Sequence, residues 1–197
     1  DGIHLIGDVM LDSFLYFSKI AAEKSKILDD LNISPRKYLV ATVHRARNTE
    51  VKENLTSIVN SFLDIDERIV FPIHPRTEKY LKQYGLYKSL ENAPNMTLIA
   101  SVGYLDSIIL VRNAKKILTD SGGLQKEAYF SKIPCITLDE ATGWLETVED
   151  GWNTLVGSDK NRIIKAVRHF QPKGKQSAVF GDGKACEKAV SIISQFG

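Results

Sequence analysis

The stretch that decides the fold runs from Lys116 to Ala128 and reads KILTDSGGLQKEA. Residues 116–119 predict a buried strand, and a helical pattern begins directly after the two glycines and continues to about Ser131. A strand that passes through a short glycine turn into a helix is the repeating unit of a parallel sheet covered by helices. The stretch therefore predicts an α/β fold.

The same alternation of short apolar runs and helical patterns extends in both directions along the chain. Strands are predicted at residues 38–43, 68–73, 96–99, 116–119, 135–138 and 153–156. Helices are predicted at residues 9–24, 55–62, 75–84, 105–111, from the glycines to 131, 160–170 and 183–196. This order predicts a single domain over residues 1–197, a doubly wound parallel α/β sheet of the Rossmann-like kind.

The composition is ordinary for a globular protein and excludes several classes of function. Of 197 residues, 43% are hydrophobic and 25% charged, and the net charge of +2 is too small to indicate a nucleic-acid or membrane-surface partner. No apolar run approaches the ~18 residues that a membrane span requires. Cys135 and Cys186 form no metal-binding spacing, and Cys135 lies in an apolar run typical of a core. We expect a cytoplasmic protein, and a chain that opens at Asp1 without methionine is expected to be a piece of a longer one.

Polar residues follow three of the predicted strands, where ligands of open parallel sheets bind. His44-Arg45 follows the first strand, His74-Pro75-Arg76 the second, and Asp120-Ser121-Gly122-Gly123 the fourth. Two of the four histidines thus fall at equivalent strand ends with an arginine nearby, although a histidine there can also simply cap a loop. His44 and His74 have no third ligand at a recognised spacing, so no metal and no cofactor are expected.

The Ser121-Gly122-Gly123 turn is the sharpest local feature. It opens a helix, so several backbone N–H groups and the positive end of the helix dipole are free, and the glycines let an anion approach the backbone. The expected ligand of this turn is a phosphate or pyrophosphate group. The alternative is a plain serine N-cap followed by a tight turn.

Glu127 lies one helical turn beyond Gly123, on the same face of the predicted helix. A carboxylate at this place can accept hydrogen bonds from the two ribose hydroxyls of a nucleotide. Alternatively, a glutamate early in a helix only complements the helix dipole.

In order and spacing, these motifs resemble those of the non-hydrolysing UDP-N-acetylglucosamine 2-epimerases. The resemblance covers essentially the whole chain, through ATVHR (41–45), FPIHP (71–75), LTDSGGLQKEA (118–128), ETVEDGWN (146–153) and GDGKA (181–185). GDVMLD (7–12) resembles the hinge between the two domains of the family. The resemblance implies the C-terminal, UDP-binding half of a glycosyltransferase-B-like enzyme, with residues 1–24 as hinge and connecting helix, 183–196 as C-terminal helix, and the N-terminal catalytic domain absent.

The resemblance also implies roles for individual residues. The Ser121–Gly123 turn is expected to hold the phosphates of UDP, Glu127 the ribose, and His44 to face the diphosphate as the catalytic residue, with Arg45 and His74 lining the cleft. The family interconverts UDP-N-acetylglucosamine and UDP-N-acetylmannosamine by anti elimination of UDP and its re-addition to 2-acetamidoglucal. The carboxylates that transfer the C2 proton come from the N-terminal domain, so we expect this chain alone to bind a UDP-sugar without turnover.

Three positions depart from the family pattern. Arg47 stands where the family usually has a glutamate, Asp139 where it has a ligand-contacting arginine, and Ser107 where some members stack an aromatic ring on uracil. Residues 139–150 carry five acids and no base beside the expected anion site. Either these carboxylates turn outward, or the affinity is lower, or the natural sugar differs.

Two other functions are compatible with the pattern. The chain can be the nucleotide-binding half of a glycosyltransferase, which keeps the same anion-binding helix and ribose-binding glutamate. It can also be a non-catalytic sugar-nucleotide-binding domain, which the replacements at Arg47 and Asp139 favour. The sugar, N-acetylglucosamine or a modified uronic acid, and the oligomeric state, a homodimer included, stay open.

Overall fold

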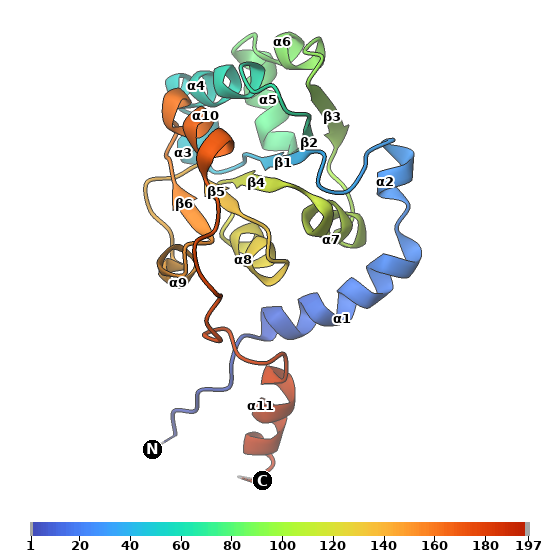
Figure 1. Cartoon of the computed structure of the whole chain (residues 1–197), viewed down its shortest axis with the longest axis vertical. Coiled ribbons are helices and arrows are strands. Elements are labelled where there is room, and N and C mark those ends of the chain that lie inside the picture. The colour runs from blue at the N-terminus through green and yellow to red at the C-terminus, as the bar shows by residue number, and fades with distance from the viewer. Residues whose placement is uncertain (1, 196–197) are drawn as a thin grey trace.

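A computed structural model describes residues 2–195, and its centre is a sheet of six parallel strands (Figure 1). The order across the sheet is β3-β2-β1-β4-β5-β6, which confirms the predicted doubly wound, Rossmann-like topology. The strands are β1 (Leu39–Thr42), β2 (Ile69–Ile73), β3 (Met96–Ala100), β4 (Lys116–Thr119), β5 (Cys135–Thr137) and β6 (Asn153–Leu155).

The longer helices lie within a few residues of the predicted positions. They are α1 (Val9–Lys24), α4 (Lys52–Leu63), α5 (Pro75–Gln83), α7 (Tyr104–Asn113), α8 (Gly122–Phe130), α10 (Lys160–His169) and α11 (Ala185–Ile193). For α11 the prediction extended from residue 183 to 196, and residue 196 lies outside the described part. Four shorter helices were not predicted, because a single turn shows no apolar periodicity: α2 (Ile27–Asp30), α3 (Ala46–Thr49), α6 (Tyr87–Glu91) and α9 (Leu145–Glu149).

The side chains of each strand alternate between two separate apolar layers. Leu39, Ala41 and Phe71 point into a core that α4, α5, α6 and α10 cover. Val40 and Ile117 point to the opposite face, which α7 and α8 cover. Cys135 belongs to this second layer and is almost completely buried, as its apolar context predicts. Because both faces of the sheet are covered, polar ligands are left only the edge where the strands end.

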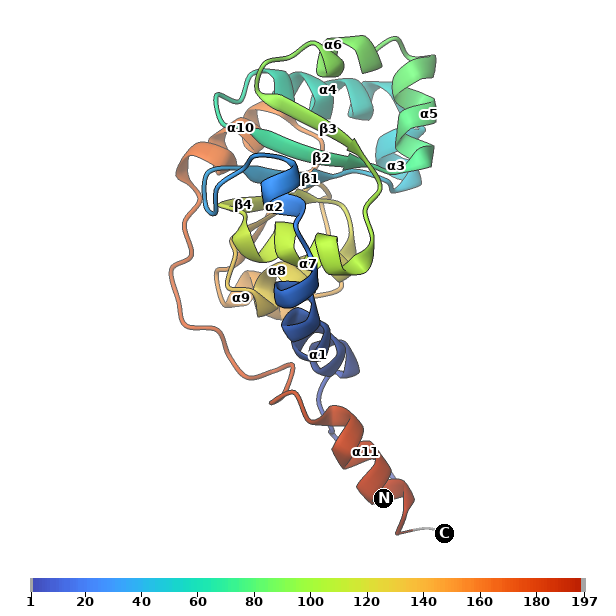
Figure 2. The same cartoon turned by 90° about the vertical axis from the view of Figure 1, so that its right-hand side faces the viewer.

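The two ends of the chain lie outside this body (Figures 1 and 2). Helix α1 packs through Phe14 and Ala21 on Ile108 of α7, as a further layer beyond the sheet. The segments before α1 and before α11 cross at Gly7 and Gly181, where Asp8 N–H donates to the Phe180 carbonyl over 2.9 Å. Beyond the crossing, α11 runs away from the body together with the N-terminal segment. No helix in the described residues is long and apolar enough to cross a membrane.

Candidate functional site

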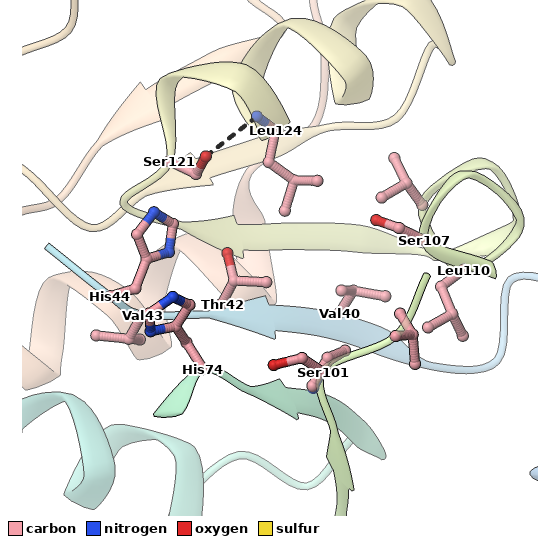
Figure 3. Close-up of a pocket in the computed structure, with 13 residues that line it drawn as sticks. Val40, Thr42, Val43, His44, His74, Ser101, Ser107, Leu110, Ser121 and Leu124 are labelled. Carbon is pink, nitrogen blue, oxygen red and sulfur yellow. Dashed lines mark hydrogen bonds between the residues drawn. The ribbon is translucent and has the colours of Figure 1, made fainter. Parts of the chain in front are cut away.

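The predicted site residues gather where the strand order reverses. Strands β1 and β4 lie side by side, with the register Thr42 to Thr119, so the loops that follow them leave the sheet together. After β1 the chain continues to β2 on one side of the sheet, and after β4 it continues to β5 on the other side. This divergence opens a crevice at the carboxyl ends of β1 and β4. His44 and Ser121 stand on its two sides (Figure 3).

Asp120 joins the two sides of the crevice. Its carboxylate, 1% exposed, accepts hydrogen bonds from His44 N–H (3.0 Å to each oxygen), Arg45 N–H (2.9 Å) and Asn48 Nδ2 (3.0 Å). A carboxylate that accepts backbone N–H groups is held in place firmly. Sequence reasoning noted Asp120 at a strand end but did not predict this role. The available signal was its position between a buried strand and the two glycines.

His44 and His74, which follow the neighbouring strands β1 and β2, lie next to each other on the same side of the crevice. Their ring centroids lie 5.6 Å apart at an interplanar angle of 35°. His74 Nδ1 accepts from Arg76 N–H over 3.1 Å, which leaves Nε2 as the protonated nitrogen of the neutral ring. His44 Nδ1 lies 3.5 Å from Asp120 Oδ1. With Nδ1 facing a carboxylate, the neutral His44 ring presents Nε2 as an acceptor and the protonated ring presents it as a donor.

The turn after β4 has the geometry of an N-cap. Ser121 Oγ accepts from Leu124 N–H over 3.4 Å, so the serine is the N-cap of α8, as the alternative interpretation predicted (Figure 3). It does not exclude an anion site, because the N–H groups of Gly122 and Gly123 have no acceptor within their own helix. A Cβ atom on Gly122 would lie 3.1 Å from Trp144 Nε1 and 3.7 Å from an Arg45 guanidinium nitrogen. Donors of three kinds thus surround one small space.

Trp144 was not singled out in the sequence, and it is fixed by a cation. The Lys126 ammonium lies 4.1 Å from the centroid of the indole ring and 2.7 Å from Asp8 Oδ2. Lys126 belongs to α8, and Asp8 is the N-cap of α1. The orientation of Trp144 over Gly122 therefore depends on residues that no short sequence motif connects.

Glu127 lies apart from the other predicted residues. Its side chain is buried between α8 and α7, where the Tyr104 hydroxyl hydrogen-bonds to its carboxylate. Burial raises the pKa of Glu127 above its usual value, and the bond from Tyr104 offsets part of that shift. The pKa of Tyr104 is raised to about 12 by burial and by the neighbouring carboxylate. The carboxylate is thus a costly buried charge with one protein partner.

Two cavities meet at the crevice, and we call them the apolar and the polar cavity. The apolar cavity, about 180 Å³, lies between β1, β2 and α7 and includes Val40, Leu110 and Ser107 (Figure 3). The polar cavity, about 850 Å³, lies over the N-terminus of α8 and is lined by Arg45, Arg47, Arg76, Asp139 and Trp144, among others. His44 and Ser121 line both.

Two of the departures from the family pattern turn out to be neighbours. Arg47 Nη1 donates to Asp139 Oδ1 over 3.0 Å. In the acidic segment that follows, Glu140 forms an ion pair with Arg162, and Asp150 accepts hydrogen bonds from the hydroxyls of Tyr129 and Ser177. Within residues 2–195 no three histidine, cysteine or carboxylate side chains gather as a metal site requires.

Fold and site together define a Rossmann-like α/β domain with the N-terminus of α8 open at its switch point. The family model for UDP-N-acetylglucosamine 2-epimerase matches residues 1–194, and the chain belongs to this family.

Individual relatives agree with this assignment. A UDP-N-acetylglucosamine 2-epimerase homolog of Methanococcus maripaludis is 53% identical over 98% of this chain and 54% of its own length. The Pseudomonas aeruginosa UDP-2,3-diacetamido-2,3-dideoxy-D-glucuronate 2-epimerase is 35% identical over 96% of this chain and 52% of its own. The crystal structure of the Methanocaldococcus jannaschii UDP-GlcNAc 2-epimerase in complex with UDP-GlcNAc and UDP superposes with a TM-score of 0.89, at 40% identity over 99% of this chain and 55% of that one. The chain spans about half the length of these relatives.

Asp120→Ala is expected to destabilise the chain by about 3 kcal/mol, because the buried Asn48 amide and the partly buried N–H groups of His44 and Arg45 lose their acceptor at once. Asp120→Asn retains one acceptor oxygen and should cost less. Urea unfolding measures both, with Asp66→Asn as the control, since the Asp66 side chain is 92% exposed. A loss for Asp120→Ala no larger than that of the control would contradict the role assigned to this carboxylate.

Glu127→Gln is expected to stabilise the unliganded chain at pH 7. Burial raises the folded-state pKa of Glu127 above 4.5, so the ionised form is less favourable in the folded than in the unfolded chain. This cost is present above the folded pKa and fades as the pH falls below 4.5, where both states bind the proton. Urea unfolding should therefore show a gain at pH 7 and little at pH 4, with exposed Glu91→Gln unchanged at both.

Proposed function

We propose that this chain is the UDP-binding part of an enzyme that inverts C2 of a UDP-linked 2-acetamido sugar, as in the interconversion of UDP-N-acetylglucosamine and UDP-N-acetylmannosamine. The observation that carries the proposal is the free N-terminus of α8 beside His44 and Arg45 at the switch point of the sheet. Membership of the epimerase family supports it and does not favour a glycosyltransferase or a non-catalytic sensor.

The two cavities suggest how the nucleotide lies. The uridine occupies the apolar cavity, and the diphosphate lies at the shared wall, where Ser121 and the N–H groups of Gly122 and Gly123 donate to it. The sugar then extends into the polar cavity. Glu127 accepts from the ribose hydroxyls, which take the place of the Tyr104 hydroxyl and give the buried carboxylate two donors instead of one.

The reaction places a specific demand on this half. A base removes the C2 proton, the electron pair forms the C1–C2 double bond, and the C1–O bond breaks with UDP as the leaving group. Negative charge grows on the departing phosphate, and fixed donors aimed at it lower the barrier. The Gly122 and Gly123 N–H groups, Arg45 and His44 are such donors. UDP then adds back to C1 as C2 is protonated on the opposite face.

The carboxylates that move the C2 proton are proposed to belong to an upstream domain. The exposed apolar side chains at the two chain ends fit a packed neighbour: Ile3 and Leu5 are almost fully exposed, and Val190 and Ile193 on α11 are about two-thirds exposed. Both ends lie on the same side of the body (Figure 2). The unpaired cysteines, Cys135 and Cys186, fit a cytoplasmic setting, which we also propose.

The chain is expected to bind UDP and to show no epimerase activity by itself. Calorimetry with UDP tests binding, and NMR detection of the manno epimer of UDP-N-acetylglucosamine tests turnover. Gly122→Val should abolish binding with an unchanged circular dichroism spectrum, because its side chain fills the space in front of the free N–H groups. UDP binding by the valine variant at the affinity of the parent would move the anion site elsewhere.

His44→Ala, in the chain joined to its upstream domain, is expected to lower kcat by about 10²-fold, the scale for removing one preorganised donor. KM should change much less, because charge on the leaving group grows only as the bond breaks. Steady-state kinetics separate the two constants. A raised KM with an unchanged kcat would make His44 a binding residue instead.

A further inference from the structure

The indole N–H of Trp144 is a donor to which the reaction described above gives no role. Trp144 is half-buried and lines the polar cavity, and among the residues that the structure describes no atom accepts from its Nε1–H. Trp152, the other tryptophan of the chain, donates from Nε1 to the Gly174 carbonyl over 3.1 Å. Because the N–H of a buried tryptophan usually has a partner, the free N–H of Trp144 indicates an acceptor that a ligand supplies.

This N–H faces the space at the glycine turn. A Cβ atom on Gly122 would lie 3.1 Å from Trp144 Nε1 and 3.7 Å from Arg45 Nη2, so the two donors flank the same point. The point lies at the first turn of α8, where the N–H groups of Gly122 and Gly123 have no acceptor within the helix. A phosphate oxygen close to this point is therefore within hydrogen-bonding distance of the indole.

The two cavities indicate which phosphate Trp144 meets. Ser121 and His44 line both cavities, whereas Trp144 lines the polar cavity and not the apolar one. With the uridine in the apolar cavity, the phosphate next to the ribose lies at the shared wall, and the second phosphate lies farther into the polar cavity. Trp144 thus reaches the second phosphate, which bears the sugar and departs from C1.

A buried ion pair holds the indole ring at this place. Lys126 Nζ lies 4.1 Å from the ring centroid and 2.7 Å from Asp8 Oδ2, and the Lys126 side chain is 8% exposed. Phe180 packs against the ring on another side, at a centroid distance of 6.3 Å and an angle of 66°. A cation over the face of an indole fixes the ring and draws electron density from its nitrogen, so the N–H becomes a stronger donor. The Asp8 carboxylate balances the charge of the ammonium.

We infer that the Nε1–H of Trp144 donates to the sugar-bearing phosphate, and that Lys126, held by Asp8, is the residue that positions this donor. The inference rests on the proposed function and adds to it a ligand-binding residue from the segment after β5. Negative charge grows on this phosphate as the C1–O bond breaks. A donor that is already fixed in the unliganded chain stabilises that charge without rearrangement.

Calorimetry with UDP and UMP tests the assignment, because UMP lacks the second phosphate. Trp144→Phe keeps an aromatic ring against Lys126 and removes the N–H. This variant is expected to weaken UDP binding about tenfold, the scale of a hydrogen bond to a charged acceptor, and to leave UMP binding within about twofold. Trp152→Phe is the matched control, because Trp152 lines neither cavity, and it should leave both affinities unchanged.

The indole signals of a proton–nitrogen NMR spectrum give a readout that a purely structural role would not move. The chain has two tryptophans, and the indole signal that is missing in Trp144→Phe identifies that of Trp144. UDP is expected to shift the Trp144 signal downfield, because its N–H gains an anionic acceptor, and UMP should shift it much less. The Trp152 signal should stay in place with both ligands.

The double variant D8N/K126M tests the role of Lys126. It removes both charges together, so that neither is left buried alone, and the asparagine can still accept from Met10 N–H as the N-cap of α1. UDP binding should weaken about threefold while UMP binding stays within about twofold. Lys79→Met is the control, because it removes an exposed lysine that lies 5.3 Å from the Tyr80 ring, and it should leave both affinities unchanged.

The outcomes separate this inference from the proposed function. If Trp144→Phe weakens UDP and UMP equally, or neither of them, the indole does not bind the second phosphate and the inference is overturned. A Trp144 signal that UDP leaves in place overturns it as well. If D8N/K126M binds UDP like the parent, Lys126 does not position the donor. Failure of the parent chain to bind UDP at all overturns the proposed function itself.

Discussion

The carboxylate of Asp120 is the constraint on which the site depends. It stands at the end of β4 and accepts from the backbone of the loop after β1, so one buried group fixes both sides of the crevice. Without it, the partly buried N–H groups of His44 and Arg45 would lose the acceptor that fixes the loop after β1. The position of the His44 ring, and through it the contact with His74, follows from this bond.

The helix that follows Asp120 connects the crevice to the periphery of the molecule. Lys126 of α8 forms an ion pair with Asp8 at the start of α1 and lies against Trp144, whose indole nitrogen faces the Gly122 turn. The Lys126 side chain is 8% exposed, so the pair is poorly screened by solvent and holds its geometry. The glycine turn and the segment that leads to the crossing of the chain ends thus share one buried cation.

Sequence reasoning predicted the strands, the long helices and the strand-end histidines, because each depends on periodicity or on the rule that ligands bind at the carboxyl edge of a parallel sheet. It did not predict the contacts that shape the site. Arg47 and Asp139 are 92 residues apart and were interpreted as two separate departures, whereas they form one pair. Trp144 over Gly122 and Tyr104 against Glu127 are also contacts between distant segments, and no local pattern specifies them.

The polar residues of the crevice separate into two groups by how fully their hydrogen bonds are made. The Asp120 carboxylate is fully used, and Asn48 Nδ2 donates to Asp120 and to the Leu138 carbonyl, so neither the carboxylate nor this amide nitrogen has capacity left for a ligand. The Gly122 N–H, the Arg47 guanidinium and the Glu127 carboxylate have partners for only part of their capacity. Groups of the first kind give the site its shape at no cost to the unliganded fold. Groups of the second kind have unmet hydrogen-bonding capacity in the unliganded chain. A bound nucleotide meets that capacity, and this gain contributes to the free energy of binding.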